Sequence, residues 1–447
     1  MRRVTARYTW DRLRVSFWFI PALMALAAVL LAWLMYWIDS RIPNAALESS
    51  RFILAGTVGE LRSSLLGVAG TVLATAGMVF TLLTLPLSTV AAQYGSRLLR
   101  VFLGDRTTQL VLGMFAGTFI YCIAAALSIP PIQVEPEGPQ LTATVGVFLM
   151  MATFATLILL VQHISIMLQA PNIAAAAGAE LLDGISEEVS EAARIGGDQS
   201  QMGQEGLGPL ETTESYGVRA WDIGYIQTID PAIMLTVAQE SDLVVRLLRK
   251  PGAFVARGDV IAQVWPAARV DAQLDKQIRR AIRLGNQRTP TQDIECAVNQ
   301  LVEMAVRAMS PAINDPFTAM TCLDYLGRGL ALFARQGEEN RNTYDRAGRL
   351  RVIFEPVTFA DLLNAAFTML RHASCDNASV LLHMLQIIDG IGQATNVPEA
   401  RRELLRHASL IQTESQAGAL IEEDRQCIQM KGEALQMLIQ SSLDLGT

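Results

Sequence analysis

Four long stretches without a charged side chain dominate the first 180 residues. They lie between Arg14 and Asp39, Arg62 and Arg97, Arg106 and Glu135, and Glu137 and Glu180. Each exceeds the roughly 20 apolar residues that a helix needs to cross a bilayer. No small-residue cleavage site follows the first stretch, so we expect it to stay as a membrane helix. The pattern therefore predicts four transmembrane helices.

The pattern changes three times after these stretches. A soluble helix and a glycine-rich polar linker are expected over residues 172–214, and short β-strands over 215–268. Helical periodicity follows over 269–447, with one short β-like stretch at 349–357. The predicted fold is an α-helical integral membrane domain over 1–171, followed by a small β-barrel-like domain and an all-α cytoplasmic domain. Helix starts are expected at Asp230, at Thr289–Gln292 and at Thr358–Asp361.

The segment "RKPGAFVARGDVIAQV" in the β region resembles half of a biotinyl or lipoyl carrier domain. Such carriers need a lysine at the tip of the turn, but the next lysine after this turn is Lys276, and Lys250 precedes it. We therefore expect a scaffold and no modified lysine.

Charge sets the expected orientation. Two segments are expected on the inner side, the amino-terminal segment and the loop between the second and third helices. Together they hold eight arginines: Arg2, Arg3, Arg7, Arg12, Arg14, Arg97, Arg100 and Arg106. The loop between the third and fourth helices holds only Glu135 and Glu137, so both termini are predicted to be cytoplasmic. Residues 171–447 carry 25 basic and 36 acidic side chains, which argues against nucleic-acid binding. The five cysteines are scattered, so neither a disulfide nor a zinc site is expected.

Two stretches carry a resemblance to a known family. They are "AQYGSRLLRVFLGDRTTQLVLGMFAGTFIYC" at residues 92–122 and "SPAINDPFTAMTCLD" at residues 310–324. The chain resembles the bacterial predicted membrane proteins grouped as domain of unknown function 2254, over nearly its whole length. The resemblance implies the topology and a bacterial inner membrane, but no established activity, cofactor or ligand.

The second membrane stretch carries small or hydroxylated residues in steps of four and three. The six residues are Gly70, Ala74, Gly77, Thr81, Thr84 and Ser88. Two interpretations stay open. Small faces allow tight helix packing inside one subunit, and a weakly polar wall can line a pore at an oligomer axis.

Three further side chains are candidates for gating or for an interface. Arg97 and Arg100 follow Pro86, where the long second stretch is expected to bend or to leave the bilayer. His163 falls near the inner end of the fourth stretch, where an imidazole could sense protons or simply bond at the interface.

The loop "SPAINDPF" interrupts the helical pattern after Met309. Ser310 precedes a proline, and Asp315 followed by Pro316 predicts a new helix start, so a helix corner explains every residue except Asn314. The alternative is a cation or polar small-molecule contact through Ser310, Asn314 and Asp315. A phosphate is excluded because the Asp315 carboxylate occupies the positive helix terminus.

The functional prediction is a homo-oligomeric channel or permeation protein with a cytoplasmic assembly and gating domain. No phosphate loop, dinucleotide fingerprint or hydrolase motif occurs, so an enzyme and a cofactor are not expected. The alternative is a membrane-anchored scaffold or sensor whose cytoplasmic domains bind a protein or a small ligand.

Overall fold

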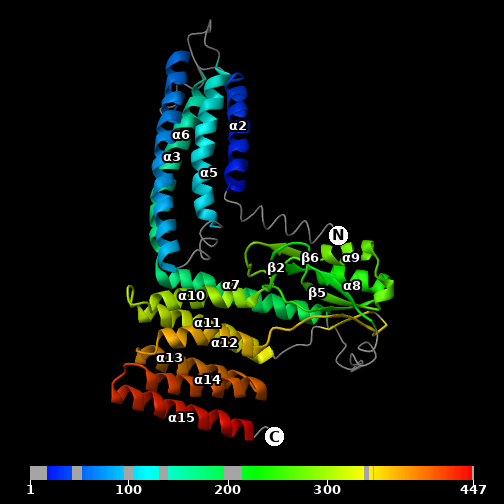
Figure 1. Cartoon of the computed structure of the whole chain (residues 1–447). Coiled ribbons are helices and arrows are strands. Elements are labelled where there is room, and N and C mark those ends of the chain that lie inside the picture. The colour runs from blue at the N-terminus through cyan, green and yellow to red at the C-terminus, as the bar shows by residue number, and fades with distance from the viewer. Residues whose placement is uncertain are drawn as a thin grey trace. The chain divides into compact units, whose positions relative to one another are not determined.

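The chain divides into two compact units, Met1–Asn172 and Ile173–Thr447 (Figure 1). The computed structural model describes residues 18–42, 53–94, 105–129, 139–195, 214–336, 342–345 and 347–444. Arg97 and Arg100 lie outside these residues.

The described part of the first unit contains four helices long and apolar enough to cross a membrane, as predicted. They are α2 (Phe19–Asp39), α3 (Val58–Tyr94), α5 (Arg106–Ser128) and α6 (Gln140–Met167). Helix α3 continues through Pro86, the residue at which the second stretch is expected to bend or to leave the bilayer. Its 37 residues extend about 55 Å, so one end of α3 passes beyond a hydrocarbon core of about 30 Å.

Helix α5 is the centre of the first unit. Half of the residues in its most apolar stretch are buried, against about a tenth of the corresponding residues in α2.

Polar contacts join the ends of the spans. The Asp39 carboxylate at the end of α2 accepts hydrogen bonds from the backbone N–H groups of Leu141 and Thr142, at 3.1 and 2.7 Å. This carboxylate thereby caps α6 from another helix.

The second unit contains two small antiparallel-rich sheets. One has the order β1-β5-β3-β8-β7 and the other β4-β2-β6. Neither closes on itself, so the expected barrel-like domain is not what the chain forms. The strands are β1 (Tyr216–Arg219), β2 (Gly224–Ile229), β3 (Val244–Leu247), β4 (Phe254–Val255), β5 (Val260–Trp265), β6 (Ile282–Gly285), β7 (Thr343–Tyr344) and β8 (Leu350–Ile353).

The sheets draw on residues from the region expected to be mainly helical, and the β-like stretch predicted at 349–357 is confirmed as β8. Strand β8 pairs with β3 in parallel, with Val352 opposite Val245, and both side chains are fully buried in the same core. Strand β6 pairs with β2 in the smaller sheet. The β domain therefore extends beyond the predicted 215–268, because strands that follow in the chain complete both sheets.

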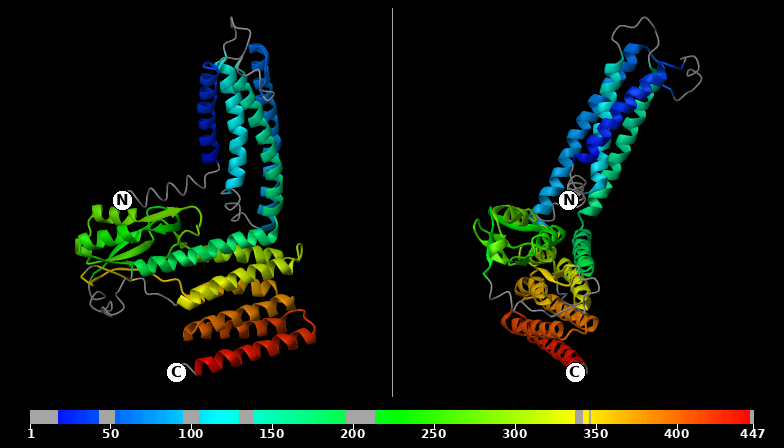
Figure 2. Two further views of the ribbon diagram at one scale, coloured as in Figure 1. Left: turned by 180° about the vertical axis from the view of Figure 1, so that it is seen from behind. Right: turned by 90° about the vertical axis from the view of Figure 1, so that its right-hand side faces the viewer.

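Helices make up the rest of the second unit. Figure 2 shows α10 to α15 lying in successive layers, each packed on its neighbours. The helices are α7 (Ala170–Ile195), α8 (Pro231–Glu240), α9 (Ala272–Arg280), α10 (Ile294–Ala308), α11 (Pro316–Gln336), α12 (Phe359–Ala373), α13 (Ala378–Ala394), α14 (Pro398–Ala417) and α15 (Glu422–Asp444), with a short 3-10 turn at Ala267–Arg269.

The helix starts predicted at Asp230 and at Thr358–Asp361 are confirmed. The Asp230 carboxylate caps α8, and Thr358 and Asp361 form a capping box at α12. The start predicted at Thr289–Gln292 is wrong, because α10 begins at Ile294 and is capped by Asp293. Gln292 instead bonds the backbone of Ile229 with both ends of its amide, so its side chain extends the smaller sheet.

Candidate functional site

The six small or hydroxylated residues lie on α3, and we call them the α3 stripe: Gly70, Ala74, Gly77, Thr81, Thr84 and Ser88. All six lie on the exposed surface of the four-helix bundle. The buried face of α3 consists of Leu61, Leu65, Val68, Ala69, Val72, Val79 and Leu83. At about 100° per residue, the stripe is centred about 160° around the helix from that face. A Cβ built at Gly70 or Gly77 would meet nothing within 4 Å. The stripe therefore does not pack against the other described spans.

Other glycines bring the spans of one protomer together. A Cβ at Gly146 of α6 would lie 2.7 Å from Leu65 of α3, and one at Gly117 of α5 would lie 3.6 Å from the backbone of Met24. A side chain at Gly113 would collide with that of Met24. The close packing of the described spans against one another therefore depends on glycines of α5 and α6. The small residues of the α3 stripe do not take part in it.

The hydroxyl groups of the α3 stripe bond back to their own helix. Thr81 Oγ1 donates to the carbonyl of Gly77 at 3.1 Å, and Thr84 Oγ1 donates to that of Thr81 at 3.0 Å. A hydroxyl that has given its proton to the backbone still offers lone pairs as acceptors. The stripe therefore presents weak oxygen acceptors and no charge.

A cavity of about 380 Å³ lies among α3, α5 and α6, and no residue of the stripe lines it. Its lining is mostly apolar and aromatic, with three threonines: Thr71, Val72, Thr75, Phe115, Met150, Met151, Thr153 and Phe154. The three hydroxyls donate to backbone carbonyls within their own helices. The cavity is an apolar hollow at the middle of the spans.

His163 has a partner that the sequence pattern did not indicate. Its Nε2 lies 3.1 Å from a carboxylate oxygen of Asp105, which also caps α5 by accepting from the backbone N–H of Thr108 at 2.7 Å. The pair joins the start of α5 to the last turns of α6. His163 therefore belongs to a polar contact between two spans.

The "SPAINDPF" loop has the geometry of a helix corner. Asn314, the one residue that the corner left unexplained, has a φ of 49°, a left-handed conformation that asparagine tolerates better than most residues. Ser310 Oγ donates to the carbonyl of Arg307 at 2.6 Å, and the Asp315 carboxylate accepts from the N–H of Thr318 at 3.1 Å. Of the three side chains proposed as ligand contacts, Ser310 and Asp315 thus form hydrogen bonds within the corner.

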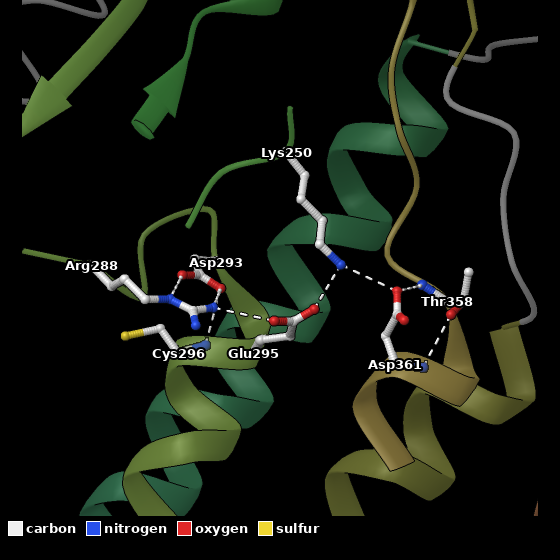
Figure 3. Close-up of polar contacts among 7 residues, drawn as sticks. All are labelled: Lys250, Arg288, Asp293, Glu295, Cys296, Thr358 and Asp361. Carbon is white, nitrogen blue, oxygen red and sulfur yellow. Dashed lines mark hydrogen bonds and ion pairs between the residues drawn. The ribbon is translucent and has the colours of Figure 1, made fainter. Parts of the chain in front are cut away.

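A group of charged side chains joins the sheets to the helices (Figure 3). We call Lys250, Arg288, Asp293, Glu295 and Asp361 the Lys250 cluster. The ammonium of Lys250 lies 2.7 Å from Glu295 Oε1 and 3.1 Å from Asp361 Oδ2, so it links the starts of α10 and α12. Burial alone would lower the pKa of Lys250, but hydrogen bonds and charges from the two carboxylates raise it above its ordinary value.

The contacts of the Arg288 guanidinium complete the Lys250 cluster. Two guanidinium nitrogens donate to the two oxygens of Asp293, at 2.6 and 2.7 Å, and one of them also reaches Glu295 at 3.3 Å. Gly252, with a φ of 89°, brings the turn after β3 so close to Asp293 that any side chain would collide with the carboxylate. Every charged group of the cluster is paired with another member, so its chemistry is that of a clasp between elements.

In the sequence, Lys250 only precedes a turn and Asp361 only belongs to a helix start, and no local pattern brings the two together. Within the described residues, no group of three or more histidine, cysteine, aspartate or glutamate side chains could hold a metal ion. His372 contacts Glu414, and His383 contacts Asp324.

Comparison with known proteins decides the family. The model of the family described as "Predicted membrane protein (DUF2254)" matches residues 14–390. The chain belongs to this family. Uncharacterised proteins of Mycobacterium bovis and of two strains of Mycobacterium tuberculosis are 27% identical to it over 384 residues, which cover 84% of this chain and 72% of theirs. No solved structure matches. The family match includes the spans, the Lys250 cluster and the corner, whereas α14 and α15 lie beyond it.

Proposed function

We propose that this membrane protein is a homo-oligomeric channel or permeation protein, in which the second unit assembles and gates the path. The observation that carries the proposal is the α3 stripe, which faces away from the other described spans of its own protomer. Small residues on an outward face allow the backbone of another membrane helix to come close. The proposed occupant of that face is another copy of this chain.

The surroundings of the stripe support a helix-sized groove. Large exposed apolar side chains flank it, with Leu73 and Phe80 on one side and Met78 and Leu82 on the other. A row of small residues between two rows of large ones can receive a second helix, or form one wall of a path at an oligomer axis. Hydroxyl and carbonyl oxygens on such a wall admit water and ions without holding them tightly.

The Lys250 cluster supports a role for the second unit. It joins the β3–β4 turn to the starts of α10 and α12, so a displacement of the helices is carried to the sheets. We propose that the unit lies in the cytoplasm of a bacterial cell, with the four helices in the inner membrane and both termini inside. A reporter fused to the carboxyl end that is active only outside the cytoplasm would contradict this orientation.

Flux through liposomes tests the permeation proposal. The full chain is reconstituted and its permeability to ions and small solutes is measured for the unchanged protein, for Thr81→Trp and for Phe80→Trp. Phe80 is the matched control, because it is 59% exposed on the same helix but lies on the flank of the stripe. We expect Thr81→Trp to abolish the flux and Phe80→Trp to retain it.

The number of copies in the particle is measured in parallel by mass in lipid nanodiscs. Equal flux in both variants would contradict a path along the stripe. A single copy in each nanodisc together with impermeable liposomes would refute the channel and favour the second candidate, a membrane-anchored scaffold or sensor.

A further inference from the structure

The corner between α10 and α11 displays two large apolar side chains that its geometry does not require. Ile313 is 45% exposed and Phe317 is 75% exposed, although the backbone around them is held by internal hydrogen bonds. The N–H of Asn314 donates to the carbonyl of Ser310 at 2.9 Å, and that of Asp315 to the carbonyl of Ala308 at 2.8 Å. A turn of this shape needs the left-handed residue and the helix cap, but polar residues would serve at 313 and 317.

Contacts inside the second unit fix the position of this corner along α7. The ring of Tyr325 lies against Gly178, and the side chains of Leu181 and Ile185 lie 2.7 and 3.3 Å from where a Cβ of Gly329 would be. Higher numbers in α7 thus meet higher numbers in α11, so the two helices run side by side in the same direction. At about 1.5 Å per residue, the start of α11 is level with the start of α7.

The start of α7 is tied by the chain to the membrane. Helix α6 ends at Met167 and α7 begins at Ala170, so few residues separate the last span from the helix beside the corner. Packed helices lie about 8–10 Å apart. The corner therefore lies beside the first turns of the helix that directly follows the last span in the chain.

We propose that the corner inserts Ile313 and Phe317 into the lipid surface on the side of the membrane where the second unit lies. Aromatic and aliphatic side chains at that depth gain by leaving water, as in interfacial anchors. The charged neighbours do not oppose insertion, because Asp315 is occupied by Thr318 and Arg307 pairs with Glu303 at 3.1 Å. The part of the chain after residue 170 is acidic, so apolar contact and not charge attraction holds the corner to lipid.

A photoreactive amino acid tests the occupant of the corner directly. The full chain is prepared with a diazirine-bearing residue in place of Phe317 and placed in nanodiscs that contain phosphatidylcholine and phosphatidylglycerol. After irradiation, mass spectrometry distinguishes adducts with lipid, with water and with protein. The matched control carries the same residue in place of Met430, which is 64% exposed on α15.

We expect lipid adducts to dominate at position 317 and water adducts to dominate at position 430. The yield of lipid adducts at 317 should be the same at low and high salt, and it should fall when Ile313→Ser is added. Water adducts at 317 would overturn the proposal, and so would cross-links to a second copy or to another segment of the chain. Lipid adducts that disappear at high salt would also overturn it, because they would indicate attraction by charge.

Discussion

His407 allows a specific test of the packing in the second unit, because its imidazole is buried in surroundings that disfavour the protonated form. The side chain is fully buried between α12 and α14, and its ring meets that of Phe367 edge-on at 5.8 Å between centroids. Nε2 lies 3.1 Å from Asn364 Oδ1, whereas Nδ1 has no partner. Burial, followed by the charges of Arg406 and Arg371, lowers the pKa of His407 from 6.5 to about 4.

The lowered pKa makes the free energy of unfolding depend on pH. As the pH falls below 6.5, the unfolded chain takes up a proton at His407, but the folded chain does so only near pH 4. The folded state therefore loses stability across this window, by up to about 1.4 kcal/mol per pH unit. Between about pH 7 and about pH 4.5 the loss from this group alone is about 2 kcal/mol.

Hydrogen exchange of the full chain in detergent measures this loss. The free energy of opening is obtained for peptides from α12 and α14, at about pH 7 and about pH 4.5, for the unchanged protein and for His407→Gln. Glutamine keeps an amide near the position of Nε2 but does not titrate. We expect the unchanged protein to lose about 2 kcal/mol more than the variant over this interval.

A packing variant serves as the control. Leu404→Met disturbs the same buried face of α14 without a titrating group, so it should lower the opening free energy by a similar amount at both pH values. Equal losses in the unchanged protein and in His407→Gln would refute the reasoning, because the imidazole would then not be held neutral by the fold.

Two further predictions concern the corner and the clasp. Asn314→Ala should lower the free energy of unfolding by about 1 kcal/mol, because alanine disfavours the φ of 49°. Asn314→Gly should not lower it. Denaturant titration of both variants measures this difference, and equal losses would contradict a purely conformational role. Lys250→Met should lower the opening free energy of the β3–β4 turn and of the start of α12 by about 1–2 kcal/mol, since Lys250 and Glu295 are three-quarters or more buried. The exposed pair Arg269–Asp242 supplies the control, because Arg269→Met should have a much smaller effect in the same hydrogen-exchange measurement.

The features predicted correctly from the sequence depend on neighbouring residues. The four spans follow from long uncharged runs, and the caps at Asp230, Asp315 and Thr358 follow from a polar side chain placed before a helix. Their causes act over a few residues, so the local pattern contains them. The start of α10 was missed because Gln292 is held by Ile229, a partner more than sixty residues away.

The features that the sequence could not give depend on distant partners. The pattern contains the α3 stripe, but only the positions of the other spans decide that it faces outward. Lys250 and Asp361 are separated by 111 residues and meet only because the helices stack beside the sheets. The exposure of Phe317 was hidden for a similar reason, since nothing in its sequence surroundings tells whether a neighbour covers it.

The parallel pairing of β8 with β3 affects how the protein is made. On the ribosome, β1, β5 and β3 emerge about 100 residues before β8, which corresponds to roughly 5–20 s of synthesis. During that interval β3 is an open sheet edge, able to pair with any extended chain nearby. The nascent protein therefore depends on rapid completion of translation to residue 353, and a truncated message would release a half-built sheet prone to aggregation.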